Sequence, residues 1–259
     1  MRGLLATLAC LAAPAAHAGA WLQPEGQGLL ITTLEATEAS RVFDVSGERI
    51  AGPDFFKSEI RYYGEFGLSD RLTLTGKSSW QYIDLDADTY SAGYAGPGDV
   101  QIGARVPLLQ QGRHRVSAEA SAGYRLGGEF VAGGDFFYGG PTVEARALYG
   151  YGWNRAYVDA QFGYRSRLGD GPDTWLADAS AGYDLGRLSL LVGASFRSTP
   201  NGRLSDDIFV PETESLKARI GATWRLKEKL RLEFARLDTL SGLNHVAETG
   251  YQFGVWQTF

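Results

Sequence analysis

Apolar and polar residues alternate along most of the chain. Around residue 60, Phe56, Ile60 and Tyr62 share one face of an extended segment, and Glu59 and Arg61 occupy the opposite face. A repeat of two is the side-chain period of a β-strand, because successive side chains point to opposite sides of the backbone. The pattern therefore predicts an all-β protein whose strands each have one apolar face and one polar face.

Segments with this alternation recur to the C-terminus and predict about twelve strands. They span residues 29–38, 56–66, 72–82, 99–106, 116–125, 143–151, 158–165, 177–184, 188–197, 216–225, 230–234 and 249–259. The alternation is weakest in the first segment, and Arg236 and Leu237 interrupt it in the eleventh. Ten or fourteen strands therefore remain as alternatives.

The connections between these segments are alternately short and long. Short connections fall at residues 67–70, 109–113, 152–154, 185–187 and 227–229. Longer, polar and glycine-rich connections fall at residues 39–55, 85–98, 127–140, 169–174, 198–213 and 241–245. Short turns on one side and long loops on the other are typical of outer-membrane barrels, whose short turns are periplasmic. An even number of strands then places both ends of the domain on the periplasmic side.

Soluble β-sandwiches and lipocalin-like barrels also have alternating strands, but their apolar faces point into a shared core. Here the polar faces carry charges of both signs on neighbouring segments, which suits a polar lumen. Aromatic residues gather toward segment ends, where an interfacial girdle would lie: Tyr62, Trp80, Tyr82, Tyr124, Tyr149, Tyr151, Tyr183, Trp224 and Tyr251. The pattern favours a transmembrane, antiparallel, up-and-down β-barrel in the outer membrane of a Gram-negative bacterium.

The first eighteen residues have the organisation of a secretory signal peptide. Arg2 precedes an apolar stretch, and residues 16–18 (Ala-His-Ala) have the small-x-small form that a signal peptidase accepts. We expect cleavage after Ala18, with cleavage after Ala20 as the alternative. Cys10 lies within the apolar stretch, which argues against a lipoprotein. The expected organisation is a signal peptide at 1–18 and one barrel domain at 19–259.

Composition supports a strand protein. The chain contains 34 glycines, one methionine and 12% aromatic residues, a mixture suited to many turns and short strands. Cys10 is the only cysteine, so the processed protein has no thiol for a disulfide or a metal site. Loss of Arg2 changes the formal charge from −5 to −6, and this charge is dispersed. We therefore expect no nucleic-acid partner and no cofactor.

Two parts of the sequence resemble known outer-membrane proteins. Phe259 is the last residue, and Tyr251, Phe253 and Val255 precede it at two-residue spacing, as in the C-terminal signal that the barrel-assembly machinery recognises. Residues 63–74 and 98–105 resemble a family of outer-membrane transporters assigned to the MetA pathway of phenol degradation. The resemblance implies an outer-membrane transporter with lipid and lipopolysaccharide as its surroundings.

Some outer-membrane barrels are hydrolases, so catalytic residues are a possible alternative. A Ser-His hydrolase needs its histidine beside the serine and oriented by a third polar group. Residues 19–259 contain only His114, in a predicted periplasmic turn, and His245, near the external end of the last strand with Asn244 and Glu248. Neither histidine stands in a His-x-Ser pattern, so we expect no enzyme; an external-loop hydrolase at His245 is a third alternative.

Acidic residues in two predicted external loops offer weak candidate sites. Asp206 and Asp207 are adjacent, as in an acid pair that activates water, although such pairs are usually solvated. Asp84, Asp86 and Asp88 have the two-residue spacing of oxygen ligands for Ca²⁺, but the glycine and glutamate of a defined calcium loop are missing. We therefore predict no metal site.

The polar faces carry the concentrated chemistry of the chain. The basic residues expected to face the lumen are Arg61, Lys77, Arg105, Arg125, Arg146, Arg165, Arg197, Arg219, Arg225 and Arg231. The acidic ones are Glu59, Glu65, Asp99, Glu119, Glu144, Asp159, Asp178 and Glu233. Eight strands enclose only side chains and sixteen enclose a water channel, so at twelve strands the lumen residues decide whether a pore exists.

Two functions follow from such a lumen. Opposed charges around a narrow water-filled pore would set a transverse field and orient a small polar or amphipathic solute. Alternatively, the charges neutralise one another in a plugged structural or adhesin-like barrel. The sequence favours the channel, with a small-molecule solute as its partner.

Overall fold

A computed structural model describes residues 19–88, 90–127, 129–130, 136–137, 139–168, 172–200, 202–205, 208–210 and 212–259. The predicted signal peptide, together with Asp206 and Asp207, lies outside the described residues. Within the described part of the chain, no helix is long and apolar enough to cross a membrane.

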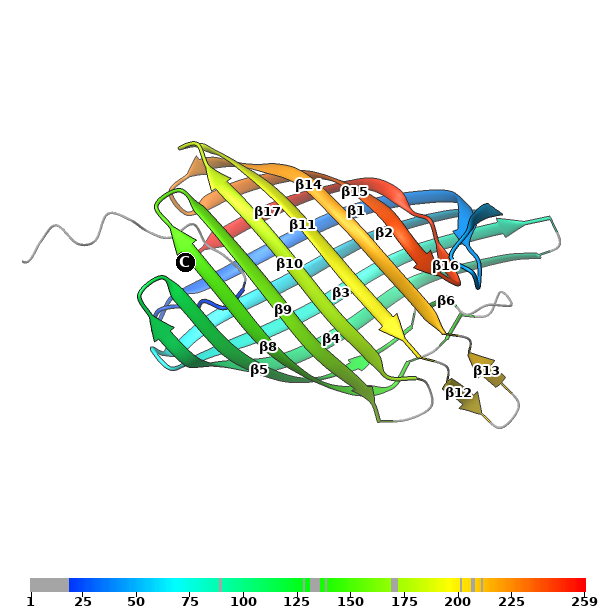
Figure 1. Ribbon diagram of the computed structural model, residues 1–259, viewed down its shortest axis with the longest axis horizontal. Coiled ribbons are helices and arrows are strands. Elements are labelled where there is room, and N and C mark those ends of the chain that lie inside the picture. The colour runs from blue at the N-terminus through cyan, green and yellow to red at the C-terminus, as the bar shows by residue number, and fades with distance from the viewer. Residues whose placement is uncertain are drawn as a thin grey trace, which may run out of the picture.

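Twelve long antiparallel strands form a closed barrel (Figure 1). They are β1 (Gly28–Phe43), β2 (Arg49–Ser69), β3 (Leu72–Ala87), β4 (Tyr90–Gln111), β5 (His114–Arg125), β8 (Pro141–Trp153), β9 (Ala156–Arg167), β10 (Thr174–Asp184), β11 (Leu188–Thr199), β14 (Thr213–Lys227), β15 (Leu230–Leu243) and β17 (Thr249–Thr258). Each strand pairs with the next, and β17 pairs back to β1 from Leu29↔Thr258 to Glu38↔Thr249. The predicted fold and number of strands are confirmed, including the weakly patterned first and eleventh strands.

Five short strands occupy one end of the barrel. β6 (Glu129–Phe130) pairs with β7 (Phe136–Phe137), and β12 (Gly202–Ser205) pairs with β13 (Ile208–Val210), so two of the long connections contain small hairpins. β16 (His245–Val246) pairs with the end of β1. The short turns lie at the opposite end, beside the C-terminus marked in Figure 1.

The alternation seen in the sequence divides the barrel wall into two faces. Apolar residues of the predicted outward set are exposed, as Ile102 (70%) and Ile220 (67%) illustrate, and polar residues between them, such as Thr73 and Gln81, are buried. The predicted girdle aromatics are exposed, except Tyr151, which is half-buried. A closed barrel with an apolar outside and a polar inside satisfies its backbone within the wall and exposes apolar side chains to lipid.

Two predicted long loops are wrong. β1 continues to Phe43 and β2 begins at Arg49, and β3 and β4 continue until only two residues, 88 and 89, separate them. Between β1 and β2 the register shifts at Ala39/Arg41. Between β3 and β4 it shifts by one residue between Ser78↔Val100 and Trp80↔Pro97, which exchanges the inward and outward positions of β4. A bulge of this kind accommodates a proline that cannot donate a backbone hydrogen bond, while the ladder continues beyond it.

The strand extensions are stabilised by a small apolar cluster on the inside of the wall. Phe55, Ile83, Leu85 and Val246 are buried together, and Tyr94 packs against them. These side chains come from β2, β3, β4 and β16, so the cluster connects segments far apart in sequence. The extended strands therefore form a rigid rim where loops were predicted.

We predict that a lysine at the lipid-facing position Ile220 destabilises the barrel. Burying a cation near the middle of a bilayer costs about 2–4 kcal/mol in such proteins. The measurement is the free energy of unfolding from lipid vesicles, with the folded fraction read from heat-modifiable gel mobility. Ser195→Lys, on the inward face of β11, is the control and should have a much smaller effect. An equal loss in both variants would show that the outward assignment of Ile220 is wrong.

Candidate functional site: the barrel lumen

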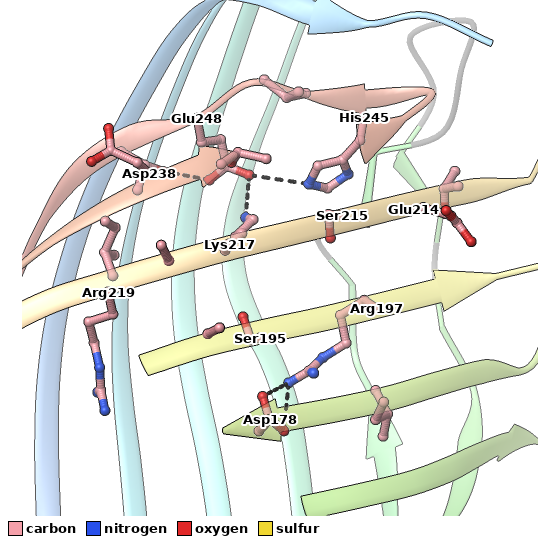
Figure 2. A pocket seen from close by; sticks show the side chains of 18 of the residues that line it. Asp178, Ser195, Arg197, Glu214, Ser215, Lys217, Arg219, Asp238, His245 and Glu248 are labelled. Carbon is pink, nitrogen blue, oxygen red and sulfur yellow. Dashed lines mark hydrogen bonds and ion pairs between the residues drawn. The ribbon is translucent and has the colours of Figure 1, made fainter. Parts of the chain in front are cut away.

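A chamber of about 790 Å³ occupies the end of the lumen away from the short turns. Its lining comes from strands around the whole barrel, including β1, β2, β9, β10, β11, β14 and β15, and from residues 244–248. Charged side chains dominate one part of the wall, as Figure 2 shows for Arg197, Lys217 and Glu248. We call this space the outer chamber.

Glu248 is a buried carboxylate of the outer chamber with three side-chain neighbours. Lys217 Nζ lies 2.7 Å from one of its oxygens, Thr37 Oγ1 donates to the other at 2.8 Å, and His245 Nε2 lies 3.9 Å away. Figure 2 shows Lys217 and His245 directed toward this carboxylate. On the adjoining strands, Arg197 Nη2 contacts both oxygens of Asp178, at 2.9 and 3.2 Å. The ion pairs hold these long side chains against the wall.

Apolar side chains also line the outer chamber. Phe43, Phe55 and Ile83 reach it from β1, β2 and β3, and Arg197 and Lys217 reach it from β11 and β14. The same arc of β1 and β2 also contributes the charged residues Glu35, Lys57 and Arg61. The outer chamber therefore has an apolar patch within a largely charged lining.

Asp44 adds a fixed negative charge at the rim. It lies in the turn between β1 and β2, where it accepts hydrogen bonds from Ser46 Oγ at 2.7 Å, Ser46 N at 2.8 Å and Glu48 N at 2.9 Å. The hydrogen bond from the Ser46 hydroxyl and those from the backbone lower the pKa of Asp44. This carboxylate is therefore ionised at neutral pH.

A ladder of ion pairs follows the wall from β3 to β11. Glu144 on β8 is contacted by Arg146 Nε, by Arg165 Nε at 2.8 Å and by Lys77 Nζ at 3.8 Å. Arg146 Nη1 also lies 2.8 Å from Asp178, which extends the ladder to Arg197. Buried charges are stable only when they are paired. The predicted set of inward charges thus forms one continuous network here.

A second chamber, of about 330 Å³, continues the lumen toward the short turns. It shares Arg61, Arg219 and Gln252 with the lining of the outer chamber. Its central acid is Glu233, which accepts hydrogen bonds from Trp256 Nε1 at 2.7 Å, Gln252 Nε2 at 2.8 Å and Arg219 Nη1 at 3.3 Å. We call this space the inner chamber.

Residues 19–27, which precede β1, lie at the end of the lumen next to the inner chamber, with residues 19 and 20 buried, 21–23 half-buried and 24–27 exposed. Trp21 packs edge-on against Tyr157 at 6.3 Å between ring centroids and against Gly150, where a Cβ would lie 2.7 Å from the indole. Gln23 N donates to Thr73 Oγ1 at 2.9 Å, and its side chain donates to Glu65 at 2.6 Å. We call residues 19–27 the N-terminal plug.

Arg105 is the residue that fastens the plug. Only 2% of Arg105 is exposed. Its guanidinium donates to Glu119 at 2.8 and 3.0 Å, to Glu65 at 2.8 Å, to Tyr63 Oη at 2.9 Å and to the backbone carbonyl of Trp21 at 3.0 Å. Each of these hydrogen bonds ends on an oxygen atom. A buried guanidinium requires such partners.

The predicted lumen residues divide into three groups. Glu59, Arg61, Lys77, Asp99, Arg125, Glu144, Arg146, Asp159, Arg165, Asp178, Arg197, Arg219 and Glu233 line the chambers or join their ion pairs. Glu65, Arg105 and Glu119 face inward but are covered by the plug. Arg225 and Arg231 pair across β14 and β15 near the short turns, and Arg225 donates to Gly186 O at 2.6 Å. This last pair lies outside the chambers because its strands end there.

Several lumen residues were missed. Glu35, which pairs with Arg61, and Lys57, whose Nζ lies 2.8 Å from Glu59, hold inward positions of β1 and β2. Lys217 was assigned to the polar face of its strand but not to the lumen. Strict alternation would have found all three. The plug carried no such signal, because residues 19–27 have no two-residue period.

The two histidines considered as catalytic candidates lie at opposite ends of the barrel. His114 lies at a short turn and stacks on Tyr151 at 4.7 Å between ring centroids, with its Nδ1 3.0 Å from Tyr149 Oη. His245 and Glu248 are 3.9 Å apart in the outer chamber wall. Among the described residues, no group of three or more His, Cys, Asp or Glu side chains is placed to hold a metal ion, and this includes Asp84, Asp86 and Asp88.

Solved structures with similar folds are outer-membrane proteins. The COG4313 outer membrane channel from Pseudomonas putida F1 superimposes with a TM-score of 0.76 at 15% sequence identity, over 95% of this chain and 100% of that chain. The NanC porin gives a TM-score of 0.53 at 9% identity, over 86% and 98% of the two chains. The translocator domain of the autotransporter NalP from Neisseria meningitidis gives 0.53 at 13%, over 92% and 90%.

No protein-family model matches the chain, and no curated protein matches it in sequence. The solved structures confirm, at the level of the fold, the likeness to outer-membrane proteins noted in the sequence. The fold, the exposed apolar belt and the polar lumen together identify an outer-membrane β-barrel. Its location is the bacterial outer membrane.

We predict that Arg105→Met destabilises the barrel by about 3–5 kcal/mol, because it leaves Glu65 and Glu119 buried without their cation. The measurement is the free energy of unfolding in detergent or lipid. Arg71→Met, in the exposed turn after β2, is the control and should cost less than about 1 kcal/mol. Adding Glu65→Gln and Glu119→Gln to Arg105→Met should recover part of the loss; absence of recovery would contradict the pairing.

Proposed function

We propose that this barrel is an outer-membrane channel that passes a small solute through its charged lumen. The observation that carries the proposal is the pair of chambers, of about 790 and 330 Å³, which share lining residues and are bordered by paired charges. Opposed charges in a narrow pore orient a solute that carries charge or a dipole.

The chemistry of the outer chamber favours an amphipathic solute. Its lining combines the apolar side chains of Phe43, Phe55 and Ile83 with cations such as Arg197 and Lys217. A solute with an apolar body and a polar end would contact both kinds of side chain, and small-molecule sites usually combine an apolar lining with a few polar groups. The proposal assigns binding and passage to these residues and no catalytic step.

The N-terminal plug defines the closed state of the proposed channel. It occupies the end of the lumen next to the short turns, which are periplasmic in barrels of this class. It is held by side-chain contacts rather than by a strand of its own, apart from a single bridge between Glu25 and Gly67. Passage therefore requires displacement of residues 19–27, or at least of Trp21, toward the periplasm.

A plugged structural barrel is the second candidate, and a specific observation supports it. Arg105 is almost completely buried and bonded to two carboxylates and to the plug backbone. If this network never opens, the chambers form a closed pocket rather than a path. The two functions differ in one measurable property, which is conductance after the plug is loosened.

The proposed partners follow from the surface. Tyr251, Phe253 and Phe259 are exposed on the outer face at the C-terminal end of the chain, where the barrel-assembly machinery would recognise them. Lipid and lipopolysaccharide would contact the apolar belt and the polar rim outside it. The solute would enter through the outer chamber.

We predict that loosening the plug increases conductance. Trp21→Ala removes the indole that packs on Gly150 and Tyr157, and the open probability in planar bilayers should rise at least about threefold over the wild type. Trp153→Ala, an exposed tryptophan next to a short turn, is the control and should leave conductance unchanged. If neither the wild type nor Trp21→Ala conducts while both show the gel mobility of a folded barrel, the channel is excluded and the structural barrel is favoured.

We predict that the cations of the outer chamber set ion selectivity. The double variant Arg197→Ser, Lys217→Ser removes two positive charges from one wall and should shift the reversal potential, measured under a salt gradient, toward cation selectivity. Arg71→Ser, outside the chambers, is the matched control. An unchanged reversal potential would place the ion path elsewhere in the lumen.

A further inference from the structure

Gly19, the first described residue, is buried inside the barrel next to Asp159 of β9. The position that a Cβ atom of residue 19 would take lies 3.1 Å from Asp159 Cγ, so any side chain there would collide with the carboxylate. A backbone nitrogen lies about 2.5 Å from the Cβ position of its own residue. The nitrogen of Gly19 is therefore within about 6 Å of the carboxyl carbon of Asp159.

Asp159 differs from the other buried acids of the lumen. It is 5% exposed, as deeply buried as Glu119, Glu144 and Glu248. Those three acids each have a lysine or arginine within 4 Å. Among the described residues, no lysine, arginine or histidine lies within that distance of Asp159. Ser180 is its hydrogen-bond partner, and Arg105 and Arg219 act on it only from farther away. A buried carboxylate without a cation in contact is unfavourable, so a positive charge beside it would be stabilising.

We propose that the cation is the α-ammonium group of Gly19, created when the signal peptide is removed. Hydrolysis of the Ala18–Gly19 bond by a signal peptidase uses one water molecule, whose hydroxyl completes the new carboxyl group of Ala18 and whose hydrogen goes to the Gly19 nitrogen. The resulting amine takes up a proton from solvent. Its ordinary pKa of about 7.7–8.0 makes it a cation at neutral pH. It then pairs with Asp159.

The hydrogen bonds of residues 20 and 21 favour cleavage after Ala18 over cleavage after Ala20. Ser117 Oγ is buried and donates to the carbonyl of Ala20 at 2.6 Å. A chain that began at Trp21 would lose this acceptor and the cation for Asp159 together. A chain that begins at Gly19 satisfies both groups, and glycine is the residue whose missing side chain allows the close approach.

The pairing makes closure of the barrel dependent on processing. Before cleavage the Gly19 nitrogen belongs to a neutral amide, and Asp159 has no ammonium partner. After cleavage the new terminus holds the plug at β9. Arg105 on β4 binds the Trp21 carbonyl and Glu65. The pairing with Asp159 thus adds to the other contacts of the plug one that exists only in the processed protein.

The first experiment uses protein purified from outer membranes after expression of the full precursor. Intact mass should correspond to a chain that starts at Gly19. The folded protein is then treated at pH 7 with an amine-reactive acetylating reagent, denatured and cut with trypsin, and acetylation is followed on the peptide 19–41. Asp159→Asn should be labelled at least about tenfold faster than the wild type. Asp99→Asn, which alters another lumen aspartate, should match the wild type.

The effect of Asp159→Asn on the stability of the plug distinguishes a paired Asp159 from an unpaired one. If Asp159 pairs with the α-ammonium group, Asp159→Asn lowers the denaturant concentration at which the plug is released. If Asp159 is an unpaired buried charge, the same change raises that concentration. Release is measured by the fluorescence of Trp21, with the other tryptophans as a constant background established by Trp21→Phe. A chain that starts at Trp21, wild-type labelling in Asp159→Asn, or a raised release concentration would each overturn the proposal.

Discussion

The pairing of β17 with β1 is the constraint on which the rest of the structure depends. In a bilayer every backbone amide and carbonyl must find a partner, and an open sheet leaves two edges unpaired. The ladder from Leu29↔Thr258 to Glu38↔Thr249 removes both edges. Closure also gives each strand an outward face and an inward face. The outward residues must be compatible with lipid, and the inward residues must be compatible with an enclosed polar space.

The inward-facing charged side chains must be neutralised within the lumen. A dozen strands bring basic and acidic side chains into a space too small to hydrate all of them, so they neutralise one another. The Glu144 ladder does this across β3, β8, β9 and β10, and Glu248 does it at the outer end. The lumen that remains is two chambers whose walls are electrostatically satisfied. Such walls attract a solute through local fields rather than through a net charge.

The plug places a polypeptide segment where a solute would leave. Trp21 fits against Gly150, and Arg105 binds the plug backbone and the acids beside it. Hydrogen bonds to Thr73 and Ser117 and the bridge at Gly67 complete the attachment. The proposed ammonium of Gly19 would add one further charged contact. Displacement of this segment would break no hydrogen bond between the long strands, so the wall would stay closed in the proposed channel.

The sequence by itself determined the fold class, about twelve strands and the two faces of each strand, because alternation is a local property that each strand shows alone. It does not show contacts between segments that are distant along the chain. The bulge at Ser78 and Pro97 exchanges the two faces of β4, so alternation alone predicts a loop where the strand continues. The pairing of Lys77 with Glu144, the burial of Arg105 and the position of residues 19–27 depend on strands that meet only when the barrel closes. Only the tertiary structure decides these, because they are contacts across the lumen rather than along the chain.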